Sequence, residues 1–203
     1  MYIIIRLIIG CIFVASSMIA IKKSKALHKR ILYIIFIGLS VMLVIALSFL
    51  PFENLFVTFD SPKAAYEYFC IGKSNIELIL EGDDCDFIVD RKNDYDTYLI
   101  VPKFEDGWKI GIGSDTRRII QKLYDGIVVY VYQYKNTNEY FITILDANGG
   151  EVAVSDEYST KFYSLARDNS SLGKTFVTYY AHITNLDFSY NITVNEHKIA
   201  LKE

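Results

Sequence analysis

Two long apolar stretches occupy the first 50 residues of the chain, and a short basic segment separates them. Residues 31–50 form a run of 20 without a charge, and such a helix matches the roughly 30 Å hydrocarbon core of a bilayer. Residues 1–21 are nearly as apolar and carry one charge, Arg6. Soluble core helices rarely contain an uncharged run of this length. The pattern therefore predicts a transmembrane helical hairpin over residues 1–50, with helices at 1–21 and 31–50.

Two kinds of processing are alternatives to a retained helix at the first apolar stretch. One is removal as a signal peptide, although Ala15-Ser16-Ser17 is a poor small-residue cleavage site. The other is lipidation of Cys11, because the preceding Ile8-Ile9-Gly10 looks like a lipobox. Arg6 lies only five residues before Cys11, which leaves no full apolar stretch ahead of it. We expect a retained helix, with the Arg6 side chain reaching toward the near membrane interface.

The segment between the two stretches, residues 22–30, is predicted to set the orientation of the chain. Its five basic residues are Lys22, Lys23, Lys25, Lys29 and Arg30. Loops rich in Lys and Arg stay on the cytoplasmic side of a membrane. Both termini are then outside, and the chain is a multi-pass protein of the cell membrane with an extracytoplasmic C-terminal domain. The same side chains would each attract anionic headgroups by about 1 kcal/mol, but the orientation role is favoured.

Beyond residue 50 the pattern is that of a soluble domain. Residues 51–60 are expected to form a tether. Ser61 or Asp60 suits the N-cap of a helix, and Pro62 suits its first position. A short helix over 62–70 is predicted.

From Asn75 onward, apolar and polar residues alternate with a period of two, and turn signals such as Asp125-Gly126 recur about every eight to twelve residues. The predicted strands are 76–81, 85–90, 97–102, 108–112, 119–124, 127–134, 140–145, 152–155, 161–166, 175–183, 188–194 and 198–201. We expect a mainly antiparallel β domain over residues 61–203, either a sandwich or an open barrel. The predicted fold class is thus a membrane-anchored α+β protein.

Charge is divided unevenly between the two parts. The first 50 residues contain six basic residues and no acidic one, whereas the remaining 153 contain 15 basic and all 24 acidic residues, a net charge of −9. An acidic domain of this kind is a poor partner for nucleic acid. The mean hydropathy of +0.22 also argues against an ordinary soluble protein.

Candidate chemistry in the β domain is sparse. Cys70 and Cys85 fall on predicted core faces, and a disulfide between them and two separate buried thiols both remain open. His182 and His197 have no second ligand at helix or hairpin spacing, so no zinc site is indicated. The serine nucleophile motif Gly-x-Ser-x-Gly and the sortase motif Thr-Leu-x-Thr-Cys do not occur.

Two further sets of residues have a structural and a functional interpretation. Acidic residues gather at Glu81, Asp83, Asp84 and Asp86 and at Asp146, Asn148 and Glu151, where turn formation explains them better than calcium binding. Tyrosines gather at Tyr130, Tyr132, Tyr134 and Tyr140. They would either stabilise the sheet or form a recognition surface, and the sheet role is favoured.

Two short segments resemble known modules. Ser61-Pro62-Lys63-Ala64-Ala65-Tyr66 resembles the helix opening of small, membrane-anchored extracytoplasmic proteins of Gram-positive bacteria. Asp106-Gly107-Trp108-Lys109-Ile110 resembles a hairpin that follows in such modules, including some NTF2-like ones. The long β region after Ile112 departs from an NTF2-like domain. The resemblance implies a place in the cell envelope and assigns no functional residue.

The sequence therefore predicts a two-pass membrane protein that presents an extracytoplasmic β domain for binding or interaction at the cell envelope. The expected partners are the membrane and either another envelope protein or a small ligand, without a cofactor and without nucleic acid. One alternative is a membrane-anchored hydrolase that uses His182 or His197. Another is an immunity-type or structural membrane protein.

Overall fold

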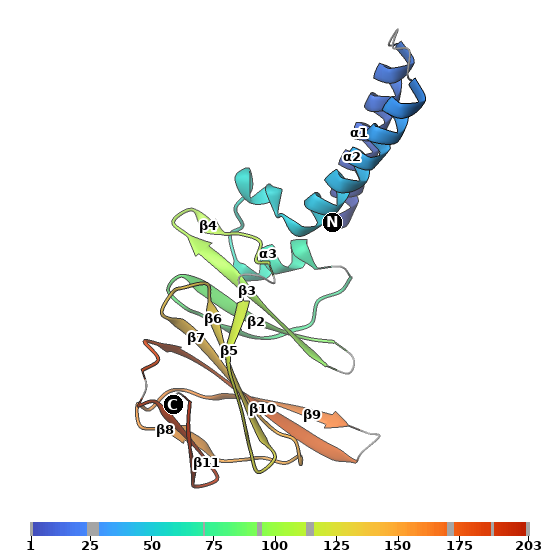
Figure 1. Ribbon diagram of the computed structural model, residues 1–203. Helices are drawn as coiled ribbons and strands as arrows, with labels where there is room; N and C mark the ends of the chain where they lie inside the picture. Colours follow the sequence, from blue (N-terminus) through green and yellow to red (C-terminus); the bar gives the residue numbers. More distant parts are fainter. Residues whose placement is uncertain are drawn as a thin grey trace.

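The structure, a computed structural model, describes residues 2–23, 29–70, 72–92, 95–112, 116–169, 173–187 and 189–201 (Figure 1). It is an α+β fold with two apolar N-terminal helices followed by antiparallel sheets, one of which is a half-barrel. Figure 1 shows the two long helices side by side, projecting from one end of the β domain. The α+β class and the antiparallel sheets were predicted from the sequence, and both are confirmed.

The two long helices are α1, Tyr2–Lys23, and α2, Lys29–Phe49. Both are long and apolar enough to cross a membrane, by length and composition. They pack closely, since a methyl group added at Gly10 would lie 2.8 Å from a Val44 side-chain carbon. The helices extend into the basic segment, because Lys22 and Lys23 end α1 while Lys29 and Arg30 begin α2. Lys25 lies outside the described residues.

A short helical region joins α2 to the β domain. It consists of the 3-10 helix η1, Phe52–Leu55, and the helix α3, Pro62–Phe69. The predicted capping is confirmed, because the backbone N–H of Ala64 donates to Ser61 Oγ at 3.1 Å and Pro62 holds the first helical position. Ala65 and Tyr66 of α3 are buried against the first sheet.

The β domain contains three antiparallel sheets. The first has the order β1-β2-β3-β4, the second β5-β6-β7-β10-β9 and the third β12-β11-β8. The strands are β1 (Ile76–Leu80), β2 (Cys85–Arg91), β3 (Asp96–Phe104), β4 (Gly107–Trp108), β5 (Thr116–Tyr124), β6 (Ile127–Tyr134), β7 (Glu139–Asp146), β8 (Val154–Asp156), β9 (Tyr163–Asn169), β10 (Lys174–Thr184), β11 (Asn191–Val194) and β12 (His197–Ala200). Each falls on a strand expected from the sequence, although β4 is shorter than predicted.

Three apolar clusters hold these layers together. The aromatic cluster, centred on Phe87, Phe141 and Tyr180, lies between the first and second sheets. A larger aliphatic cluster lies between the second and third sheets and includes Ile142 and Ile192. The third cluster lies under α3, on the outer face of the first sheet. The second sheet is thus covered on both faces, which explains why the central strand β7 is buried almost throughout.

Cys70 and Cys85 are not bridged to each other. Cys85 belongs to the aromatic cluster on the inner face of the first sheet, whereas Cys70 packs against the cluster under α3 on the outer face. Because alternate side chains of a strand point to opposite faces, the sheet itself separates the two thiols. The disulfide that the sequence left open is therefore absent for a geometric reason.

Polar contacts fix α1 to the region that follows α2. The Arg6 guanidinium donates from Nε to Glu53 Oε1 at 3.2 Å and from Nη2 to Glu53 Oε2 at 2.8 Å. Nη2 also donates to the Leu50 carbonyl at 2.8 Å, and the guanidinium lies over the Phe52 ring. The Arg6 side chain is thus buried in an ion pair, where the sequence led us to expect a side chain reaching to the interface.

Candidate functional site

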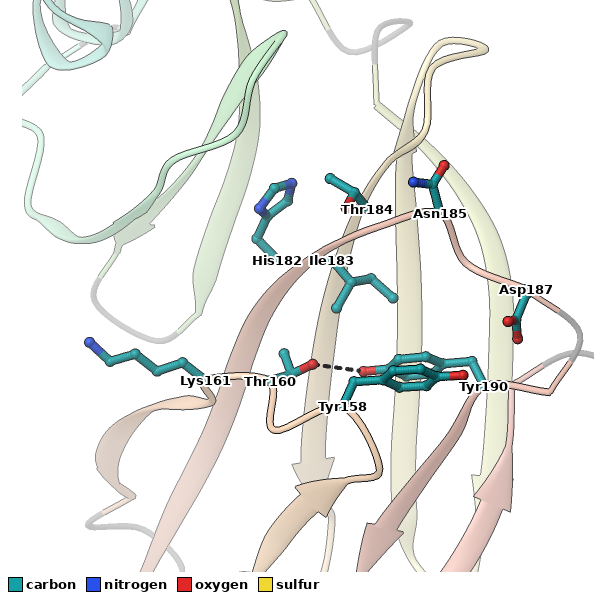
Figure 2. A pocket seen from close by; sticks show the side chains of 9 residues that line it. All are labelled: Tyr158, Thr160, Lys161, His182, Ile183, Thr184, Asn185, Asp187 and Tyr190. Carbon is teal, nitrogen blue, oxygen red and sulfur yellow. Dashed lines mark hydrogen bonds between the residues drawn. The ribbon is translucent and has the colours of Figure 1, made fainter.

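A surface trough lies beside the end of β10 and between two loops (Figure 2). Its volume is about 350 Å³, within the range of small-ligand sites. The lining residues are Tyr158, Thr160, Lys161, His182, Ile183, Thr184, Asn185, Asp187 and Tyr190. Two further hollows share residues with it: one of about 390 Å³ includes Lys161 and His182, and one of about 420 Å³ includes Thr184, Asn185 and Glu139. His182 therefore lies where concave surfaces meet.

A buried carboxylate holds the His182 ring. Glu139 opens β7 and is 3% exposed, and its Oε2 lies 2.5 Å from His182 Nε2. The strand register explains the pairing: His182 is opposite Phe141 and Thr184 is opposite Glu139, so Glu139 and His182 are diagonal neighbours on one face. The Phe141 ring supports the imidazole at 5.0 Å. The position and orientation of the ring are therefore fixed from two sides.

The same carboxylate joins two sheets. Glu139 Oε1 accepts a hydrogen bond of 3.0 Å from the backbone N–H of Asp83, in the turn between β1 and β2. One oxygen thus holds the first sheet and the other holds the imidazole on the second. Glu139 is at once a structural link and the orienting partner of His182.

A carboxylate–imidazole pair is also part of general-base and triad chemistry. A triad needs a nucleophile on the other ring nitrogen. Among the residues that the structure describes, the hydrogen bond to Glu139 is the one that the His182 ring makes, so no described hydroxyl or thiol is hydrogen-bonded to its other nitrogen. Within the same residues, no group of three His, Cys, Asp or Glu side chains could hold a metal ion.

Two stacked tyrosines lie at the other end of the trough. The rings of Tyr158 and Tyr190 lie 5.4 Å apart and nearly parallel, with an interplanar angle of 2°. Tyr190 is buried, whereas Tyr158 is 57% exposed. Figure 2 shows the pair across the trough from the side chains of Thr184 and Asn185. The stack offers a ligand an aromatic surface beside hydrogen-bonding groups.

Asp156 anchors this stack. Its carboxylate accepts from the Tyr190 hydroxyl and from the backbone N–H groups of Tyr158, at 3.0 Å, and Thr160, at 2.9 Å. The Thr160 and Tyr190 hydroxyls are also within 3.4 Å of each other (Figure 2). The loop after β8 is thereby fixed by one side chain.

Acid should release this anchor. Burial opposes ionisation of Asp156, but hydrogen bonds from Thr160 and Tyr190 outweigh it and lower the pKa of the carboxyl. Its stabilisation is therefore complete above the unfolded value of about 3.9 and is lost as the pH falls through the folded-state pKa. Asp156→Asn should lower the free energy of unfolding by about 1–3 kcal/mol at pH 7. Urea unfolding from pH 7 down to acid measures the difference, which should shrink with falling pH.

The exposed neighbour Ser155 provides the control for this measurement. Ser155→Ala should change the free energy of unfolding by less than about 0.5 kcal/mol at every pH. An Asp156→Asn effect of constant size across the pH range would contradict a role for the ionised carboxylate.

The other residues singled out in the sequence lie away from the trough. Tyr134 and Tyr140 are buried, and burial also raises the pKa of Tyr132 to about 12. Tyr130 is half-buried and packs against Tyr132, with the Arg118 guanidinium 5.1 Å from its ring centroid. The four tyrosines therefore form no common exposed stripe.

The remaining histidine and the first acidic cluster also have separate surroundings. His197 is exposed on β12, with its ring 5.4 Å from that of Tyr124. Asp86 is buried, accepts from the Trp108 indole N–H and the Gly82 backbone, and has a pKa raised by burial. Asp86 thus links β2 to β4 through Trp108, whereas His197 lies outside the lining of the trough.

Sequence reasoning missed Glu139, Asp156, Tyr158 and Tyr190. One local signal existed: Asp156 is followed after two and four residues by the N–H groups that it binds, as in an Asx turn. The pairing of Glu139 with His182 has no such signal, because 43 positions separate them.

Comparison of the chain with protein-family models, curated proteins and solved structures gives no match. The function is therefore argued from the geometry and chemistry of the molecule.

Proposed function

We propose that the protein is a two-pass membrane protein that holds its β domain on the outer side of the cell membrane and binds a ligand or envelope partner in the trough. The observation that carries the membrane part is the outer surface of the α1–α2 pair. Large apolar side chains there are more than half exposed, among them Ile4, Ile12, Ile34 and Met42. A surface of this kind is stable in lipid and a liability in water.

The orientation follows from charge. Lys22, Lys23 and Arg30 gather at the end of the hairpin that is remote from the β domain. Basic residues at one end favour the cytoplasmic side for that end. The β domain then faces outward.

The trough suits a neutral ligand that has both an apolar face and hydrogen-bonding groups. Tyr158 supplies an exposed aromatic surface, and Thr184 and Asn185 supply exposed hydroxyl and amide groups. Lys161 and Asp187 contribute one charge of each sign, so the lining gives no net charge selection. Rigid aromatic surface beside a few polar groups is the usual composition of a binding site.

Labelling and crosslinking in intact cells test this proposal. With Cys11 and Cys70 replaced by alanine and Cys85 left buried, a membrane-impermeant maleimide should label Ser155→Cys from outside and should label Ser24→Cys only after permeabilisation. A photo-reactive phenylalanine at Asn185 should give a light-dependent adduct. The exposed β5 position Gln121 is the matched control and should give none.

The crosslink has a second control within the trough. Tyr158→Ala should reduce the Asn185 adduct, because it removes the aromatic surface without touching the reactive position. Equal adducts from Asn185 and Gln121, or no adduct from Asn185, would rule out binding in the trough. Labelling of Ser24→Cys from outside would rule out the orientation.

The His182–Glu139 pair favours a second candidate, a hydrolase in which His182 activates water toward a ligand in the trough. The captured ligand decides between the two. If the protein is a hydrolase, the wild-type chain should cleave the ligand, and the His182→Gln variant should leave it intact. A binding module should return it unchanged with either protein.

A further inference from the structure

In the segment between α2 and α3, polar side chains are buried and apolar side chains are exposed. Glu53 is 5% exposed and Asn54 is half-buried, whereas Leu55 and Phe56 are 78% and 81% exposed. Val57 follows at 43%. Adjacent exposed apolar side chains of this kind mark a surface that meets a partner or a membrane. Here the polar side chains face the protein and the apolar ones face away from it.

Three sets of contacts hold this arrangement. Glu53 is paired with Arg6. The Asn54 amide accepts from the Ile110 backbone N–H at 2.8 Å and donates to the Ile110 carbonyl at 3.0 Å. Phe59 and Trp108 exchange backbone hydrogen bonds of 2.8 and 2.9 Å. Residues 55–57 are thus held between fixed flanks and do not fold back onto the domain.

The segment between α2 and α3 lies beside the open end of the helical hairpin. η1 begins three residues after α2 ends, and Leu50, also in this junction, is 60% exposed. Arg6, in the second turn of α1, contacts both Leu50 and Glu53. Figure 1 shows this junction at the end of α1 and α2 that faces the β domain. If the hairpin spans the membrane as proposed, this is the level of the outer interface.

The tip of the β3–β4 hairpin adjoins the same segment. A methyl group added at Gly107 would lie 2.6 Å from the Phe59 carbonyl oxygen, which shows how closely the two backbones pack. Phe104 at this tip is 48% exposed, with Lys109 Nζ 4.4 Å from its ring centroid. Aromatic and basic side chains together are typical of surfaces that meet lipid headgroups.

We propose that Leu55 and Phe56 form a foot that inserts into the outer leaflet at the lipid interface, with the β3–β4 tip resting against the headgroups. The foot rests on the proposed insertion of the α1–α2 hairpin. It extends that proposal by fixing the orientation of the β domain relative to the membrane. The trough would then open at a constant height and angle above the bilayer.

Spin-label accessibility tests the foot. The full chain, with Cys11 and Cys70 replaced by alanine and Cys85 left buried, is reconstituted into vesicles of phosphatidylcholine with a minor share of phosphatidylglycerol. A nitroxide is attached at Phe56→Cys, at Met42→Cys on the exposed face of α2, or at Leu123→Cys. Leu123 is 73% exposed beside the β5–β6 turn and is the matched water-facing control. Collision with oxygen, which concentrates in lipid, is compared with collision with a water-soluble nickel complex.

The expected result is a severalfold higher oxygen-to-nickel accessibility ratio at Phe56 and Met42 than at Leu123. A lipid-like ratio at Met42 with a water-like ratio at Phe56 would overturn the foot and leave the proposed membrane insertion intact. A water-like ratio at Met42 would overturn both. Strong dipolar broadening between Phe56 labels would show that a second copy of the chain covers this surface, and this too would overturn the foot.

Discussion

Replacing Arg6 with alanine should destabilise the protein by about 3–5 kcal/mol, because it leaves a buried carboxylate without its partner. The Arg6 and Glu53 side chains are only 4% and 6% exposed, and two hydrogen bonds join them. Solvent cannot compensate a charge at that depth. The α1–α2 hairpin should also separate from η1, since Arg6 binds the Leu50 carbonyl as well. Urea or thermal unfolding of the full chain in bicelles measures the loss.

A double variant distinguishes the effect of the ion pair from the cost of leaving one buried charge unpaired. Arg6→Met combined with Glu53→Leu replaces both charges by apolar groups of similar size, and such exchanges are often neutral or stabilising. The double variant should therefore be more stable than Arg6→Ala alone. Lys63→Ala serves as the exposed control: the Lys63–Glu67 pair is 61% and 46% exposed and should contribute no more than about 0.5 kcal/mol. If Arg6→Ala and Lys63→Ala had equal effects, the ion pair would not be what fixes the hairpin.

Local sequence patterns predicted the long helices, α3 and the strands, but not the 3-10 helix η1 within residues 51–60. The run without charge over 31–50 predicted α2, and Ser61 with Pro62 predicted the start of α3. The period of two and the turn residues predicted the strands, because each hairpin is encoded by its own alternation and turn. These features depend on neighbours within a few positions, where a sequence is most informative.

The arrangement of the elements depends on contacts that no local pattern encodes. β10 pairs with β7 as well as with β9, so the strand order of the second sheet departs from chain order. The mixture of polar and apolar residues over 51–60 predicts a tether, yet Asn54 and Phe59 bind residues some 50 positions away. Arg6 and Glu53 are likewise 47 positions apart. Each partner was visible in the sequence, but the pairing was not.

The candidate site shows the same limit. The sequence pattern predicts that His182 lies in a strand, but its surroundings depend on Glu139 and Phe141, which the sheet register brings beside it. The stacking of Tyr158 on Tyr190 has no local sequence signal, because the loop after β8 and the residue before β11 meet only in the folded chain. Those tyrosines are largely core, as expected for aromatic residues in a sheet covered on both faces.

Phe87→Ala should cost about 3–5 kcal/mol, because Phe87 joins the first two sheets at their common core. Its side chain is fully buried, and its ring centroid lies 5.0 Å from Phe141, 5.5 Å from Tyr98 and 5.8 Å from Tyr132. Removing the ring opens a cavity and also loses these aromatic contacts. Urea unfolding in bicelles measures the cost. Leu123→Ala, at a position 73% exposed, should change the free energy of unfolding by less than about 0.5 kcal/mol.

The effect should extend to the trough, because the Phe141 ring that packs on Phe87 also supports the His182 imidazole at 5.0 Å. In Phe87→Ala the crosslink from Asn185 should weaken even under conditions where the domain stays folded. Phe87→Leu retains most of the volume, so its cost should stay below about 1.5 kcal/mol and the crosslink should persist. A Phe87→Ala variant as stable as Leu123→Ala would mean that the two sheets are held together by other contacts. The shape of the trough would then have to be explained by the Glu139 link and the Asp156 anchor alone.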